Sequence, residues 1–158
     1  MRDLLHSLSD CLHVNSLSNS MYGWTCIQRS LAMSLERKAL VVDDDAGVRL
    51  LIKRILSANG FSVELARDGA EAIEKIASSD YDVIILDLMM PRINGRTVVH
   101  YLNDHAPDEL RKVIVLTAFG KSAINEVCPP VGRHIEKPFD INHLLREVTE
   151  CAWMSGAK

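Results

Sequence analysis

Short apolar runs alternate with helical stripes from Lys38 onward, and this alternation restricts the fold more than any other feature of the sequence. The runs are almost continuously apolar, which is typical of parallel strands that are covered on both faces. The stripes repeat at helical spacing, and the first of them consists of Val48, Leu51, Ile52, Ile55 and Leu56. We therefore expect an α/β fold in which right-handed crossovers place helices on both faces of a parallel sheet.

Five strands and five helices are expected in strict alternation. The strands are predicted at residues 38–42, 62–66, 81–86, 113–116 and 133–136. The helices are predicted around the first stripe, at 69–79, after Gly95, at 121–127 and at 140–153. This number of strands fits a flavodoxin-like, doubly wound (βα)5 fold with the strand order 2-1-3-4-5.

Turn-forming residues mark where two of these helices end. Asn59-Gly60 follows the first stripe, and glycine readily takes the left-handed conformation that closes a helix. Pro107 prevents the third helix from continuing. Pro129-Pro130 cuts the fourth helix short, so this helix is predicted to be brief.

Polar side chains that could form one ligand site follow four of the predicted strands. Asp43 and Asp44 come after the first strand, Asp87 after the third, Thr117 after the fourth and Lys137 after the fifth. The carboxyl ends of parallel neighbours meet at one edge of the sheet, where open α/β folds place their ligand sites. We expect these five side chains to share one pocket.

The acidic members of this set indicate a metal site. Three carboxylates so close together would repel one another and shift their pKa values unless a cation joined them. Ligands that are all oxygen atoms favour Mg²⁺ or a similar hard ion such as Mn²⁺.

Four strings of the sequence resemble the receiver domain of two-component response regulators. They are LVVDDD at 40–45, IILDLMMPRING at 84–95, LTA at 116–118 and EKPF at 136–139. Each string alone is weak evidence, but the four in this order on alternating strands and helices are specific. The resemblance covers residues 36–153.

The resemblance implies a role for each residue at the strand ends. Asp87 would accept a phosphoryl group from a sensor histidine kinase or a histidine phosphotransfer protein, forming an aspartyl phosphate. Asp44, Asp87 and the backbone carbonyl of Met89 would hold the metal, and Asp43 would act through water. Lys137, before a typically cis Pro138, would place positive charge on the phosphoryl oxygens, and Thr117 would offer them a hydroxyl.

Two further residues stand close to this pattern. His134 lies three residues before Lys137, where the family usually carries Tyr or Phe as a switch residue paired with the Thr. An imidazole is smaller and forms hydrogen bonds, so His134 is either that switch residue or a partly exposed strand histidine. Asp45 is interpreted as the N-cap of the first helix.

The ends of the chain are assigned by their composition. Residues 1–35 are rich in Ser and Asn, with one short stripe at Leu4, Leu5, Leu8 and Leu12. They are a disordered extension, a short helix that docks on the domain or a partner, or sequence upstream of a natural start at Met33. The receiver domain is predicted at 36–153, with a tail at 154–158 and no attached output domain.

The charge and hydropathy of the sequence restrict which partners the protein can bind and in which cellular compartment it is expected. The net charge is −3 with no basic run, so we expect no direct DNA binding. No apolar stretch approaches the ~18 residues of a membrane span, and the start of the chain does not fit a secretory signal. The four cysteines lack the spacing of metal ligands. We expect a cytoplasmic protein with reduced cysteines.

The preferred interpretation is a single-domain response regulator whose phosphorylation switches binding to a downstream protein. It would turn over no metabolite, and its own chemistry would be limited to phosphoryl capture and slow hydrolysis. One alternative is a receiver-like adaptor that signals without phosphorylation. Another is a phosphatase of the haloacid dehalogenase type, although Gly47 does not fit that motif and no acidic pair follows Lys137.

Overall fold

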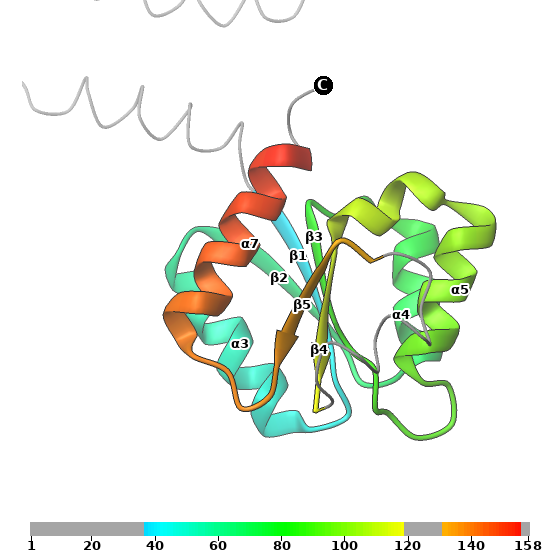
Figure 1. The fold of residues 1–158 in the computed structure, drawn as a ribbon, viewed down its shortest axis with the longest axis horizontal. Coiled ribbons are helices and arrows are strands. Elements are labelled where there is room, and N and C mark those ends of the chain that lie inside the picture. The colour runs from blue at the N-terminus through cyan, green and yellow to red at the C-terminus, as the bar shows by residue number, and fades with distance from the viewer. Residues whose placement is uncertain (1–36, 119–130, 156–158) are drawn as a thin grey trace, which may run out of the picture. The chain divides into compact units, whose positions relative to one another are not determined.

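The computed structural model describes residues 37–118 and 131–155. The strands in this part of the chain are β1 (Arg37–Val42), β2 (Phe61–Ala66), β3 (Val83–Asp87), β4 (Val113–Thr117) and β5 (Arg133–Glu136). The helices are α3 (Ala46–Ala58), α4 (Gly69–Ser78), α5 (Gly95–His105), the 3₁₀ helix η1 (Pro107–Lys112) and α7 (Ile141–Ser155). Figure 1 shows their arrangement.

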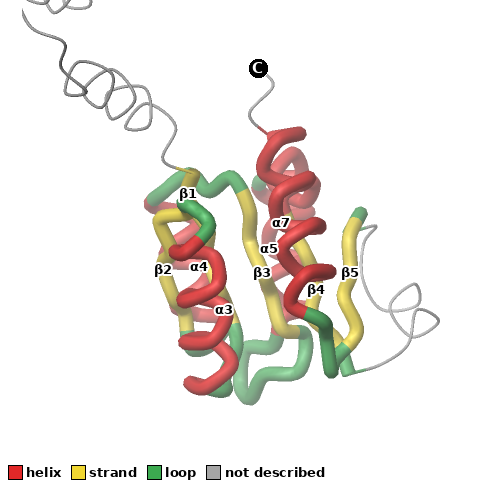
Figure 2. The backbone as a smooth tube through the Cα atoms, turned by 90° about the vertical axis from the view of Figure 1, so that its left-hand side faces the viewer, coloured by secondary structure: helices red, strands yellow, loops and turns green. Residues whose placement is uncertain are grey.

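The five strands form one parallel sheet in the order β2-β1-β3-β4-β5, which confirms the predicted fold and strand order. Figure 2 shows the strands running alongside one another. Because neighbouring strands point the same way, their carboxyl ends lie at the same edge of the sheet.

Helices cover both faces of the sheet, as the apolar strands predicted. Alternate residues of β1 belong to separate cores: Leu40 and Val42 pack with α4 and α5, whereas Ala39 and Val41 pack with α3 and α7. The same division appears in Figure 1, where α3 and α7 lie on one side of the strands and α4 and α5 on the other. A strand that faces two cores has no solvent side, and this explains why the polar residues of β1 and its flanks lie at the two ends and not in the middle.

An aspartate side chain and a glycine close the two ends of α3. The Asp45 carboxylate caps α3 by accepting hydrogen bonds from the amides of Gly47 and Val48, at 2.7 and 3.1 Å, as predicted. Asn59 follows α3 and Gly60 has a φ of +85°, so the predicted end of this helix is also confirmed. Positive φ disfavours residues with a Cβ, which explains the glycine.

The structure differs from the sequence-based expectation mainly near Pro107. Helix α5 ends at His105 as expected, but the chain then forms η1, which was not predicted. Only Leu110 of η1 is buried, so this segment has no apolar period that could reveal it. Strand β3 begins at Val83 rather than at residue 81, and the predicted fourth helix and residues 1–35 lie outside the described residues.

Candidate functional site at the carboxyl edge of the sheet

The strand-end residues gather at the carboxyl edge of four adjacent strands. Asp43 follows β1, Asp87 is the last residue of β3, and Thr117 is the last residue of β4. Lys137 follows β5 directly. Asp43, Asp87 and Thr117 are buried at the rim of the two cores, because each continues an apolar strand that is covered on both sides.

Three carboxylates form a cluster at this edge. Asp43, Asp44 and Asp87 each offer one oxygen, and these atoms lie within 4.8 Å of one another. Asp43 and Asp87 are buried, whereas Asp44 is exposed, so the cluster opens to solvent on one side. An all-oxygen donor set of this kind fits a hard divalent cation such as Mg²⁺.

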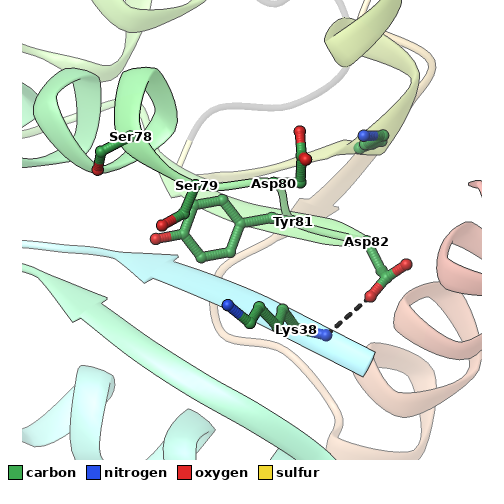
Figure 3. Close-up of a pocket in the computed structure, with 7 residues that line it drawn as sticks. Lys38, Ser78, Ser79, Asp80, Tyr81 and Asp82 are labelled. Atoms are coloured by element: carbon green, nitrogen blue, oxygen red, sulfur yellow. Dashed lines mark hydrogen bonds between the residues drawn. The ribbon is translucent and has the colours of Figure 1, made fainter. Parts of the chain in front are cut away.

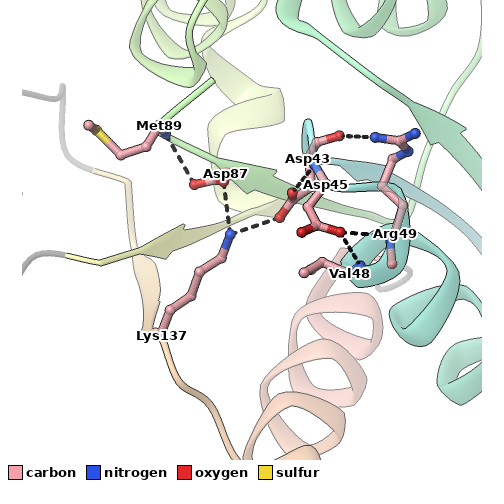
Figure 4. A network of polar contacts seen from close by, with 8 residues as sticks. Asp43, Asp45, Val48, Arg49, Asp87, Met89 and Lys137 are labelled. Atoms are coloured by element: carbon pink, nitrogen blue, oxygen red, sulfur yellow. Dashed lines mark hydrogen bonds and ion pairs between the residues drawn. The ribbon is translucent and has the colours of Figure 1, made fainter. Parts of the chain in front are cut away.

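Lys137 joins two of the three acids. Its Nζ atom donates hydrogen bonds to Asp43 Oδ2 and Asp87 Oδ2, both at 2.8 Å (Figure 4). The backbone amide of Lys137 donates to the carbonyl of Thr117 at 2.7 Å, which fixes the residue beside β4. The bond to Pro138 is cis, as the resemblance implied.

The pKa values of the cluster show how its charges balance. Burial raises the pKa of the Asp43 carboxyl, and the hydrogen bonds from Lys137 and from the Asp45 amide offset this only in part. Burial by itself would lower the pKa of Lys137, but its hydrogen bonds to Asp43 and Asp87 outweigh that effect and raise it. The lysine therefore stays protonated, while one ammonium group does not fully compensate the acids around it.

Backbone groups hold the two buried carboxylates in place. The Asp45 amide donates to Asp43 Oδ1 at 2.8 Å, and the Met89 amide donates to Asp87 Oδ1 at 3.1 Å. The Arg49 guanidinium donates to the Asp43 carbonyl at 2.6 Å (Figure 4). Sequence reasoning missed Arg49, although its place in the first turn of α3 puts it near the end of β1.

Thr117 and His134 face the same side of the sheet. Thr117 shares the face of Val115, which belongs to the core under α4 and α5. His134 is the register partner of Val115, and partners in parallel strands point to the same face. The next pair confirms this assignment, because Leu116 and its partner Ile135 both belong to the opposite core. Thr117 and His134 therefore lie on the same face of adjacent strands, and a switching role for His134 stays a prediction.

A separate cavity lies at the opposite edge of the sheet (Figure 3). It has a volume of about 480 Å³ and is lined by Lys38, Ser78, Ser79, Asp80, Tyr81, Asp82 and Lys112. The Lys38 amide donates to Asp82 Oδ2 at 2.8 Å, and burial together with the Glu64 carboxylate raises the pKa of Tyr81 to about 12. None of the predicted site residues lines this cavity, so it is distinct from the acid cluster.

Within residues 37–118 and 131–155, every helix is too short or too polar to cross a bilayer.

Comparisons with known proteins point to one family. The family model described as "Response regulator receiver domain" matches residues 39–149. The chain is 41% identical over 112 residues to the response regulator MprA of Mycobacterium avium, covering 68% of this chain and 47% of that protein. MprA of Mycobacterium ulcerans gives the same identity and coverage. The chain spans about half the length of the curated relatives it matches.

Solved structures give the same result. The Francisella response regulator 1452 receiver domain is 30% identical, with a TM-score of 0.68, over 75% of this chain and 98% of that one. The response regulator TrrA of Thermotoga maritima, solved in complex with Mg²⁺-BeF, is also 30% identical, with a TM-score of 0.64, over 73% of this chain and 98% of that one. The chain is therefore similar to receiver domains in both sequence and backbone.

Proposed function

Because this chain belongs to the response regulator receiver family, we propose that Asp87 accepts a phosphoryl group and that its modification switches binding to a partner protein. Proteins of this family are signalling phosphoacceptors and not enzymes that turn over a metabolite. The observation that carries the proposal is the position of Lys137, whose Nζ atom bridges a buried Asp43 and a buried Asp87 beside an exposed Asp44.

The geometry supports Asp87 as the nucleophile among the three acids. It is held on both sides, by the Met89 amide on Oδ1 and by Lys137 on Oδ2. Asp43 also accepts hydrogen bonds on both oxygens, but it is buried more deeply than Asp87, and Asp44 is exposed. The resemblance to receiver domains assigns the nucleophile to Asp87. Phosphoryl transfer depends mainly on positioning and charge neutralisation, and Asp87 receives both from its neighbours.

The proposed reaction moves a phosphoryl group from a phosphohistidine to Asp87. A carboxylate oxygen of Asp87 forms the new P–O bond while the P–N bond to the donor imidazole breaks, and the imidazole retains that electron pair and takes a proton. Lys137 keeps a positive charge beside the oxygens of the transferred group, and Thr117 offers them its hydroxyl. Slow hydrolysis of the aspartyl phosphate would return the carboxylate.

The donor set is suited to Mg²⁺ or Mn²⁺, which would neutralise the negative charge on the phosphoryl oxygens when bound. Asp44, Asp87 and the Met89 carbonyl would hold the ion, and Asp43 would act through water. The fit rests on three carboxylates with oxygens within 4.8 Å and only one lysine between them.

Intact-mass spectrometry after incubation with acetyl phosphate tests this function. We expect the wild-type chain to gain the mass of one phosphoryl group in the presence of Mg²⁺, and Asp87→Asn to gain none. The adaptor alternative predicts no gain for either protein. A phosphatase of the haloacid dehalogenase type does not account for the family match.

The domain limits and the source of the phosphoryl group are proposals as well. We propose a receiver domain at 36–153, an extension at 1–35 and a tail at 154–158. A chain that starts at Met33 is therefore expected to fold and to be phosphorylated like the full chain.

The donor of the phosphoryl group would be a histidine kinase or a histidine phosphotransfer protein.

A further inference from the structure

The loop between β3 and α5, residues 88–94, determines how Asp87 is presented. The loop closes on itself, because the Gly95 amide donates to the Leu88 carbonyl at 3.3 Å. A Cβ added at Gly95 would overlap the backbone carbonyl of Asp87, so the end of the loop presses against its start. Met89 lies inside this loop, and its amide is the hydrogen-bond donor to Asp87 Oδ1.

A second contact ties the far side of this loop to the start of α4. The Gly69 amide donates to the Ile93 carbonyl at 3.1 Å. A Cβ at Gly69 would lie 2.6 Å from that carbonyl oxygen and 2.5 Å from Ile93 Cγ2, so only glycine permits this approach. The loop is therefore held at its base and again near its end.

An ion pair completes the second contact. Arg92 Nη2 lies 2.9 Å from Asp68 Oδ2, and the Asp68 side chain is only 12% exposed. The other oxygen of Asp68 accepts from the Glu71 amide at 3.0 Å and caps α4. The Glu71 amide and Arg92 both lower the pKa of the Asp68 carboxyl, so it is charged at neutral pH. Asp68 thus joins the helix to the loop.

The backbone conformation of Arg92 indicates that its ion pair with Asp68 has a structural role. Arg92 has a φ of 66°, and it is the one residue other than glycine with positive φ among residues 37–118 and 131–155. This conformation is unfavourable for an L side chain, whereas Gly or Asn would adopt it more easily. An arginine at this position therefore implies that its side chain compensates, and the Asp68 ion pair is the contact that does so.

We propose that Arg92 is a positioning residue: its ion pair with Asp68 fixes the loop so that the Met89 amide stays on Asp87 and the Met89 carbonyl stays at the metal site. This inference rests on the proposed function of Asp87 and adds the β2–α4 junction to the residues that act on it. An exposed ion pair contributes little to overall stability. The ion pair acts instead on the position of Met89 at the metal site, and contacts just outside the ligands of a metal strongly influence how those ligands are oriented.

Three substitutions separate the ion pair from the backbone conformation. Arg92→Asn keeps a residue that tolerates positive φ but removes the charge. Asp68→Asn keeps an N-cap for α4 and also removes the charge. Arg92→Lys restores a positive charge and serves as the conservative rescue. Arg111→Asn is the control for loss of an exposed arginine, because Arg111 is as exposed as Arg92 and forms an ion pair with Asp108 away from the acid cluster.

The first readout needs no metal. We expect amide hydrogen exchange of Met89, measured by NMR in EDTA, to accelerate several-fold in Arg92→Asn and Asp68→Asn. Arg92→Lys is expected to stay close to the wild type, and Arg111→Asn to match it. Met89 exchange that is the same in Arg92→Asn and the wild type would overturn the proposal, whatever the function of Asp87.

The second readout is the affinity for Mg²⁺, measured by calorimetry on the full chain. We expect Kd to rise by about 3- to 10-fold in Arg92→Asn and Asp68→Asn, which is below the tenfold or more typical of buried outer contacts because Arg92 is largely exposed. A purely structural role would lower the melting temperature in EDTA and leave Kd unchanged, which would contradict the proposal. If the wild type bound no Mg²⁺ while Met89 exchange still changed, the proposed function would fail and the role of Arg92 in the loop would stand.

Discussion

Lys137 donates a hydrogen bond to Asp87 at 2.8 Å, although the two residues are 50 positions apart in the sequence. Strands β3, β4 and β5 bring them together, since each ends at the same edge of the sheet. The same ammonium group reaches Asp43, so one positive charge serves two buried acids. This shortage of positive charge is the basis of the first two predictions.

Lys137→Met is expected to destabilise the metal-free protein and to make Mg²⁺ more stabilising. Removing the ammonium leaves two buried carboxylates without their cation, and losing a partner of this kind costs about 1–3 kcal/mol. The Lys137 side chain is 25% exposed, so we expect the lower part of that range. Urea unfolding with EDTA and with Mg²⁺ measures both effects. Equal losses in the two conditions would show that the metal does not share the role of the lysine.

Asp44→Asn is expected to separate metal binding from stability. Asp44 is the exposed member of the acid cluster, so its replacement is expected to change the free energy of unfolding in EDTA by less than about 0.5 kcal/mol. Affinity for Mg²⁺ is expected to fall by more than about tenfold, because even outer contacts of a metal site contribute that much. Calorimetric titration checks the second value. An unchanged Kd would remove Asp44 from the metal site.

Gly95→Ala is expected to destabilise the domain strongly, by about 2–4 kcal/mol, because the new Cβ would overlap backbone atoms of Asp87 and Leu88 that cannot move aside. Gly132→Ala is the matched control. A Cβ at Gly132 meets nothing within 4 Å, so we expect a change of less than about 0.5 kcal/mol. Chemical unfolding of both variants tests the packing of the β3–α5 loop, and similar stabilities would contradict it.

His134 is expected to respond to phosphorylation of Asp87. It lies on the same face as Thr117, one strand away, so an inward movement of Thr117 would leave space beside the imidazole. We expect the ring resonances of His134 to shift when acetyl phosphate and Mg²⁺ are added to the wild type, and not in Asp87→Asn. His105, which stacks on Tyr101 in α5, provides an internal control. A His134 ring that stays unchanged on phosphorylation would remove it from the switch.

The fold was predictable because the apolar pattern of the strands is visible in the sequence itself. Apolar runs that end in Asp87 and Thr117 indicate a buried parallel sheet, and parallel strands bring their ends together. Asp45 and Gly60 were predictable because helix caps depend on local chemistry. These features need only short stretches of sequence.

Contacts made across the fold could not be predicted in this way. Arg92 pairs with Asp68 at a distance of 24 positions, so this contact leaves no local pattern. Arg49 is only six positions from Asp43, but its partner is a backbone carbonyl, a group that every residue carries. Helix η1 was missed because its six residues bury only Leu110. The roles of Asp43, Asp44, Met89 and Thr117 came from the resemblance and stay predictions, although the structure places Asp43 and Asp44 with Asp87 and Met89 beside it.

The central claim is that Asp87 is the phosphoryl acceptor, and chemical mapping of the modified residue tests it most directly. Borohydride reduces an aspartyl phosphate to homoserine, so wild-type protein treated with acetyl phosphate and Mg²⁺ is expected to carry homoserine at position 87 in peptide mass spectra. Omitting Mg²⁺ or adding EDTA is expected to abolish this product. Homoserine at position 43 or 44 instead, or phosphorylation that persists undiminished in Asp87→Asn, would contradict the account.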